Sequence, residues 1–437
     1  MATKPREHQR IAISTVGTQT LSAATLSALL IASGVFAISL RVSGSLTGIA
    51  FLRDVLPAQA LYLILNGCLA LLMIRGARVL SRMGVFATLS YFYLLSMLAL
   101  HVVASPPAAP DAWNTGPTEL ARAFALQTMM LTAILVGATP TMSRKQAVFC
   151  LKLIIATGVF MVAVACLQLA GLVPHFYFQW YQGSHLPRPT GGLEHPHFFA
   201  VFLVLAIAAT KWLRTSGSLR RWVYWLLFLA LSAGIIISTS RVGVLAFCVY
   251  LLAESLASSR TMDRLAKKLI AISSLLVLGA AVAGTVWILF PTSSAAHFME
   301  VFTSAFISSF SGDASDGEFL RGRGSRWGHE IDLIMADPMS MLFGYGHQPF
   351  VSHNLILRQL QVSGLSGTTC YIVMLGVFLA TIVARAPKNS RPVAIGITAS
   401  VILASLTFPV FVSITIISAI SLLIVASSSL SPTDGNP

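Results

Sequence analysis

Residues 197–257 read HFFAVFLVLAIAATKWLRTSGSLRRWVYWLLFLALSAGIIISTSRVGVLAFCVYLLAESLA and decide the fold. The stretch contains apolar runs at about 197–213, 222–240 and 242–257, separated first by a basic loop and then by the short turn STSR. Each run approaches the roughly 20 apolar residues that an α-helix needs to cross a bilayer. The stretch therefore predicts three consecutive membrane-spanning helices.

The same pattern continues over the whole chain of 437 residues, of which 56% are hydrophobic and only 10% are charged. Soluble domains contain about 25% charged residues, so the composition excludes a soluble enzyme and a disordered protein. We expect an all-α, polytopic membrane protein that forms a single integral membrane domain over residues 1–437. The twelve expected transmembrane helices lie at about 21–40, 56–74, 84–104, 119–139, 147–173, 197–213, 222–240, 242–257, 269–291, 366–384, 393–408 and 410–428.

The distribution of positive charge predicts the orientation of these helices. If the N-terminus is cytoplasmic, most Lys and Arg residues fall in cytoplasmic connections, as the positive-inside rule requires. The formal net charge of +14 then reflects topology rather than binding of nucleic acid, and both termini are cytoplasmic. The positive residues left on the outer side are all arginines: Arg41, Arg53, Arg122, Arg188, Arg241, Arg321, Arg323, Arg326 and Arg358.

Arginine without lysine favours bidentate binding of phosphate or carboxylate groups. The alternative is that these arginines pair with outer-side acids such as Asp54, Glu119 or Glu194. All histidines except His8 also fall at or beyond the outer face. Both asymmetries indicate that any chemistry takes place on the outer side.

Two outer connections are long. The shorter outer loop is expected at 174–196, where aromatic residues, proline and glycine are frequent, and the longer one at 292–365. Within the long loop, an amphipathic helix is expected to lie on the membrane surface or to cap the bundle. Its apolar face would carry Trp327, Ile331, Ile334 and Met335, and its polar face Arg326, Glu330 and Asp332.

The most specific pattern lies where the long loop re-enters the membrane. His353-Asn354 is followed, after nine residues, by Gly364-Leu365-Ser366-Gly367. This H[NSQ]-x9-GxxG pattern resembles the signature of the O-antigen ligase family. The wider superfamily also includes the repeat-unit polymerases of bacterial surface polysaccharides.

Other segments resemble further motifs of this family, in the same order along the chain. They are RPTGGLEHPH at 188–197, where His197 replaces the commoner Asn, STSRVG at 238–243, GRGSRW at 322–327 and LFGYG at 342–346. The resemblance covers about 180–385. It implies a metal-independent, inverting transfer of a glycan from undecaprenyl pyrophosphate on the periplasmic face of the bacterial inner membrane.

Such a transfer needs a base or orienting group for the acceptor hydroxyl and positive charge for the pyrophosphate leaving group. We expect His353 to be the base, and Arg241 and Arg323 to be catalytic residues at the phosphates. The residues expected to bind substrate are Arg188, Arg326, Asn354, Gly364 and Gly367. The sequence contains no DxD motif for a metal, and no cofactor is expected.

Simpler roles remain open for several of these residues. His353 could be a structural loop histidine, and Arg241 could cap helix carbonyl groups. Gly364 and Gly367 could serve only to allow close helix packing. A zinc site at His195 and His197 is disfavoured because no third ligand lies nearby in the sequence.

Three functions fit the pattern to different degrees. An O-antigen ligase would transfer the glycan to a sugar of lipid A–core, whereas a polymerase would transfer it to another lipid-linked repeat unit. A transporter or lipid flippase would require ionisable groups near the bilayer midplane. The charged residues inside the expected spans, Arg122, Lys152 and Glu254, all lie near helix ends, which favours a transferase.

Overall fold

The computed structural model describes residues 82–104, 117–137, 143–173, 178–181, 184–259, 323–345 and 354–430, together with a few single positions. The spans expected at 21–40, 56–74 and 269–291 lie outside these ranges.

The described residues are predominantly helical, and each of the other nine expected spans contains a helix. These helices are α3 (Arg82–Ala104), α4 (Pro117–Gly137), α5 (Arg144–Leu169), α6 (Pro196–Thr215), α7 (Arg221–Ile237), α8 (Arg241–Ser258), α13 (Leu355–Arg385), α14 (Arg391–Thr407) and α15 (Ile414–Ser429). Among the described residues, α5, α6, α8 and α13 are long and apolar enough to cross a membrane, and shorter apolar stretches occur in the remaining five.

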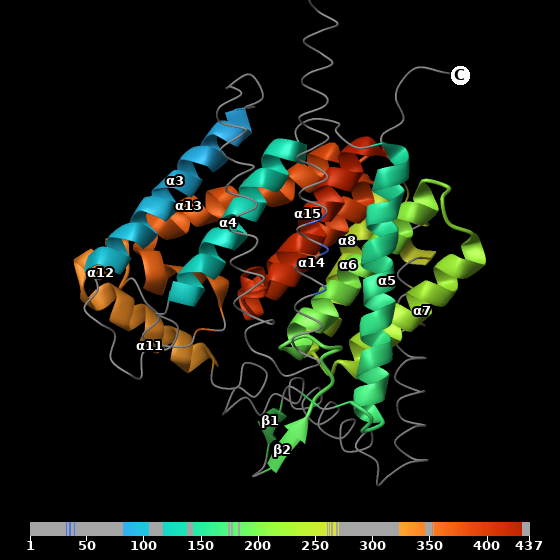
Figure 1. The fold of residues 1–437 in the computed structure, drawn as a ribbon, viewed down its shortest axis with the longest axis horizontal. Helices are drawn as coiled ribbons and strands as arrows, with labels where there is room; N and C mark the ends of the chain where they lie inside the picture. The colour runs from blue at the N-terminus through green and yellow to red at the C-terminus, as the bar shows by residue number, and fades with distance from the viewer. Residues whose placement is uncertain are drawn as a thin grey trace, which may run out of the picture.

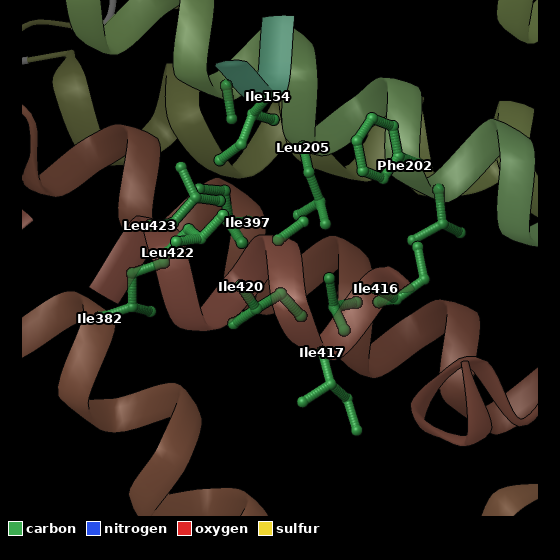
Figure 2. Close-up of a cluster of buried hydrophobic side chains, with 14 of the residues drawn as sticks. Ile154, Phe202, Leu205, Ile382, Ile397, Ile416, Ile417, Ile420, Leu422 and Leu423 are labelled. Atoms are coloured by element: carbon green, nitrogen blue, oxygen red, sulfur yellow. The ribbon is translucent and has the colours of Figure 1, made fainter. Parts of the chain in front are cut away.

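The helices form a bundle around α15 and α6. In Figure 1, α3, α4 and α13 lie on one side and α5 to α8 on the other, with α14 and α15 between them. The side chains of α15 from Ile414 to Ala426 are buried all round the helix, which is typical of a central helix. Figure 2 shows isoleucine and leucine side chains of α15 packed with Phe202 and Leu205 of α6 and with Ile154 of α5.

Contacts between helix termini identify the two ends of the bundle. At the first, which we call the basic end, Arg144 donates a hydrogen bond to the carbonyl of Ser216 (3.1 Å) and Thr215 contacts Ser390 (3.0 Å). This end carries Arg214, Arg220, Arg221, Lys388 and Arg391, all exposed.

The opposite end, which we call the site end, contains the N-termini of α6 and α8, the C-termini of α5 and α7, and the end of α14. Because α6 and α8 both run from the site end to the basic end, Lys211 can pair with Glu254 at 3.8 Å between their C-terminal halves. Helices α11 (Arg323–Ala336) and α12 (Pro338–Phe343) lie towards the same end, at the lower left of Figure 1.

The structure corrects two boundaries that were predicted from the sequence. The segment 174–196 is not only a loop, because β1 (Phe178–Tyr181) and β2 (Ser184–Pro187) form an antiparallel hairpin. The long loop ends at Asn354 rather than at 365, since α13 begins at Leu355 and bends at Gly364, where the backbone leaves helical geometry (φ 60°, ψ −168°). The expected division at Pro409 is confirmed, because the 3-10 helix η4 (Val410–Val412) separates α14 from α15.

Candidate functional site

Arg188 holds the turn between α7 and α8. Its guanidinium donates from Nε to Thr239 Oγ1 (2.5 Å), and from Nη2 to the carbonyl oxygens of Thr239 (2.6 Å) and Ser238 (3.5 Å). Ser238 is the C-cap of α7, so these bonds satisfy carbonyl groups at the end of that helix. Arg188 therefore caps the C-terminal end of α7, a role that the sequence suggested for Arg241.

The backbone of this turn is strained at Thr239. Its φ angle is 61°, a conformation that β-branched residues rarely adopt. Such a conformation costs on the order of 1–3 kcal/mol and is found most often at functional sites. The strained residue lies two positions before Arg241, which is half-buried and is the first residue of α8.

Ser240 joins the turn to α6. As the N-cap of α8, its Oγ accepts a hydrogen bond from the backbone N–H of Gly243 (2.9 Å) and lies 2.6 Å from Nδ1 of His197. Gly243 makes this possible, because a Cβ there would clash with Ala200 of α6. His197 is thus a buried hydrogen-bonding residue at the junction of α6 and α8.

Two histidines and one phenylalanine pack together beside this turn. The ring of His195, the N-cap of α6, accepts a hydrogen bond at Nδ1 from the backbone N–H of His197 (3.2 Å). The two imidazole rings are 4.4 Å apart between centroids, and the ring of Phe408 lies 4.5 Å from His195 and 4.6 Å from His197. Phe408 was not predicted as part of this group, because nothing local in the sequence connects the end of α14 with residues 195–197.

The glycine turn after Arg188 is fixed to α5. The fully buried side chain of Gln168 accepts hydrogen bonds from the backbone N–H groups of Thr190 (2.9 Å) and Gly191 (3.2 Å). Gly191 has a φ of 60°, and a Cβ there would lie 2.6 Å from the ring of Phe199. The segment 188–197 is therefore held by α5, by α6 and by the α7–α8 turn.

A second group of motif residues meets where α12 contacts the bend of α13. Gly344 (φ 80°) and Gly364 (φ 60°) lie with their backbones in contact. A Cβ on Gly344 would lie 2.5 Å from the backbone nitrogen of Gly364, and a Cβ on Gly364 would clash with the backbone of Leu342 and Phe343. The segments LFGYG and GLSG thus pack directly against each other.

Hydrogen bonds reinforce this contact. The backbone N–H of Tyr345 donates to the carbonyl of Gln361 (2.7 Å), and Ser366 Oγ donates to the carbonyl of Leu342 (2.7 Å). The Tyr345 hydroxyl donates to the carbonyl of Leu333 in α11 (2.8 Å). Gly364 therefore has the packing role that the sequence left open, and its expected role in substrate binding stays a prediction. Gly367 is also closely packed, because a Cβ there would clash with the Ser363 side chain.

Asn354 is the N-cap of α13. Its Oδ1 accepts hydrogen bonds from the backbone N–H groups of Ile356 (2.8 Å) and Leu357 (3.2 Å). His353 lies outside the described residues, but its position in the chain is directly before this cap. The motif therefore begins at a capped helix N-terminus, where the helix dipole favours negative charge.

The amphipathic helix expected at 326–335 forms as α11, but one residue of its polar face is placed differently. Ile331 and Met335 of the expected apolar face are exposed, as they would be in a helix on the membrane surface, whereas Glu330, expected on the polar face, is only 2% exposed. The reason is that Gln361 of α13 donates a hydrogen bond from Nε2 to Glu330 Oε2 (3.3 Å). The packed face therefore runs through Glu330 and the buried Ile334.

The exposed apolar residues of α11 continue into α12 as Met339, Leu342 and Phe343. This surface agrees with a helix pair lying at the membrane surface. Arg323 is the first residue of α11. The side chains of Arg323 and Arg326 lie outside the described part of the chain, so their expected contacts with phosphate stay predictions.

The expected site residues thus form two groups, both at the site end of the bundle. The first group consists of Arg188, Arg241, His195 and His197 around the α7–α8 turn. The second consists of Asn354, Gly364 and Gly367 of α13 and its N-cap, packed against α12. Helix α14 packs against both α8 and α13. Within the described ranges, no three His, Cys, Asp or Glu side chains lie together as metal ligands would. No family model and no curated protein matches the chain.

Proposed function

We propose that this protein is a membrane glycan transferase, an O-antigen ligase. In this proposal it moves a polysaccharide from undecaprenyl pyrophosphate to a sugar hydroxyl of lipid A–core, with inversion at the anomeric carbon and without a metal. The chain has twelve transmembrane helices in the bacterial inner membrane, both termini are cytoplasmic, and the site end faces the periplasm. The positive-inside rule supports this orientation, because Arg214, Arg220 and Arg221 are at the opposite end.

The observation that carries the proposal is the pairing of motifs. The segments that resemble the family at 188–197 and 238–243 are joined by Arg188 and by His197. Those at 342–346 and 364–367 are joined by the contact between Gly344 and Gly364. Segments that separately resemble motifs of the family in the sequence therefore touch in pairs in the fold.

The local chemistry supports an anionic donor. Arg188 bonds the carbonyl groups of the turn, and Arg241 follows this turn as the first residue of α8, where the helix dipole adds to its positive charge. In the proposed mechanism Arg241 and Arg323 stabilise the charge that develops on the pyrophosphate leaving group. His353 accepts the proton of the acceptor hydroxyl as the glycosidic bond forms.

The contacts of Glu254 disfavour an ion-coupled transporter. This carboxylate is buried, but it lies near the basic end and pairs with Lys211 at 3.8 Å. A coupling site would place such a group near the bilayer midplane. The second candidate is therefore the repeat-unit polymerase of the same superfamily, which differs in its acceptor.

A lipopolysaccharide gel of a strain that lacks the gene distinguishes these functions. Loss of all long-chain ladders, with long polymer accumulating on the lipid carrier, is the result expected for a ligase. Lipid A–core carrying a single repeat unit would instead identify a polymerase. An unchanged gel would contradict both.

Complementation of this strain tests the central histidine. His353→Ala is expected to abolish the ladder while expression and donor binding persist. His329→Ala, at an exposed histidine of α11, is the matched control and should restore the ladder. A normal ladder with His353→Ala would overturn the assignment of the base.

A further inference from the structure

A groove opens on the side of the bundle near the basic end, away from the motif residues. It has a volume of about 450 Å³ and lies between the middle of α5, the C-terminal end of α6 with the α6–α7 connection, and α7. Its lining consists of Lys152, Ile155, Ala156, Val159, Phe160, Leu213, Leu219 and Leu227. The groove is therefore apolar apart from one ammonium group.

The helices that form the groove expose large apolar side chains around it. On α5, Phe149 and Phe160 are 60% and 49% exposed, and on α7, Trp222 and Leu226 are 64% and 57% exposed. None of the other described helices covers these side chains, and in a membrane-spanning bundle such a surface faces lipid rather than water. Tryptophan is common at the level of the lipid headgroups, and Trp222 is the second residue of α7, next to the basic end.

Lys152 is unusual on this surface. It lies eight residues after the start of α5, which corresponds to roughly 12 Å along the helix axis. Among the described residues no carboxylate forms an ion pair with it. A lysine at this depth on a lipid-facing surface is costly unless its ammonium reaches an anion or the interface. Helical side chains lean towards the N-terminus, which places the interface and its anions in the direction of the basic end.

We infer that the groove binds an anionic phospholipid of the surrounding membrane, with one acyl chain in the apolar channel and the headgroup phosphate paired with Lys152. The volume lies within the roughly 300–1,000 Å³ typical of sites for small molecules. A protein partner would instead need a contact of about 1,000 Å² or more. The exposed Arg220 and Arg221 beside the α6–α7 connection add positive charge that attracts an anionic headgroup. This site is independent of the proposed transferase activity.

Native mass spectrometry of the full-length protein tests the inference. The protein, stripped of lipid in detergent, is titrated with phosphatidylglycerol or with phosphatidylcholine of the same acyl chains. One phosphatidylglycerol per chain is expected, bound about fivefold more tightly than phosphatidylcholine if a single lysine near the surface supplies the preference. Equal affinity for the two lipids would overturn the inference.

Two variants separate the headgroup contact from the acyl-chain contact. Lys152→Gln should remove the preference for phosphatidylglycerol, and Ala156→Phe, which fills the groove, should weaken binding of both lipids. Lys267→Gln and Ala257→Phe, both at exposed positions outside the groove, are the matched controls and should behave as wild type. Retained preference in Lys152→Gln, unchanged binding in Ala156→Phe, or a dimer that Ala156→Phe dissociates would each show that an anionic lipid does not occupy the groove.

Discussion

The backbones of Gly344 and Gly364 touch where α12 ends and α13 bends, and neither position has room for a Cβ atom. Gly364 has a φ of 60° and a ψ of −168°, a region that is almost restricted to glycine. The contact therefore depends on two glycines at once. It accounts for the first glycine of the GxxG segment, which lies at the bend of the helix that Asn354 caps.

Gly364→Ala is expected to destabilise the protein by at least about 1–3 kcal/mol, because it adds backbone strain as well as a steric clash. Thermal unfolding in detergent measures the effect. Gly376→Ala, in the same helix, is the matched control, since a Cβ there meets nothing within 4 Å. Equal unfolding temperatures for the two variants would contradict the close contact of the backbones.

Arg188→Ala is expected to lower the free energy of unfolding by about 1.5–3 kcal/mol, the usual contribution of hydrogen bonds made by a charged group. Arg188→Lys should recover only part of this, because an ammonium cannot reproduce the guanidinium bonds to Thr239 Oγ1 and to the carbonyl oxygens of the turn. Thermal unfolding, with Arg214→Ala at the basic end as control, measures both. Full recovery with lysine would show that the charge matters and the geometry does not.

Arg241→Ala and Arg323→Ala are expected to reduce transfer by about 100-fold each, as loss of a group that stabilises transition-state charge often does. Lysine at either position should rescue poorly. The measurement is the transfer rate from purified lipid-pyrophosphate donor at varied donor concentration. Unchanged donor kinetics in both variants would remove these arginines from the mechanism.

Transfer activity is expected to be unaffected by EDTA, because arginines rather than a metal are proposed to balance the charge of the pyrophosphate. The assay compares purified protein before and after chelation and dialysis. Activity that disappears with EDTA and returns with Mg²⁺ would require a metal site.

The N-cap of α12 is expected to depend on pH. Hydrogen bonds from the Ser340 side chain, and from the backbone N–H groups of Ser340 and Met339, lower the pKa of Asp337 below its usual value of 3.8. A lowered pKa in the folded state stabilises the cap above the unfolded pKa, and this stabilisation disappears as the pH falls through the folded pKa.

Hydrogen exchange of the α12 amides in buffers from neutral to below pH 4 measures this dependence, after correction for the intrinsic exchange rate. Asp337→Asn, which can accept the same backbone bonds without titrating, should remove the dependence. A wild-type profile that stays constant down to strongly acidic pH would show that the charge of Asp337 does not contribute.

The sequence was sufficient to predict helices in the apolar runs that the structure describes, because long apolar runs have few alternative structures. It was not sufficient to predict which face of α11 is packed. Glu330 is buried because Gln361, thirty-one residues away, supplies a donor, and periodicity contains no information about such a partner. The same limit applies to Arg188, whose bonds to the α7–α8 turn span about fifty residues of sequence.

The contact of Phe408 with His195 and His197 has a consequence for biogenesis. The ribosome completes α6 and α8 long before it reaches α14. The rings of His195 and His197 can therefore pack against Phe408 only after almost the entire polypeptide has entered the bilayer. Chains truncated before α14 would insert their early helices without ever forming this contact. A chain that ends between His197 and Phe408 therefore contains both imidazole rings without the phenylalanine that packs against them.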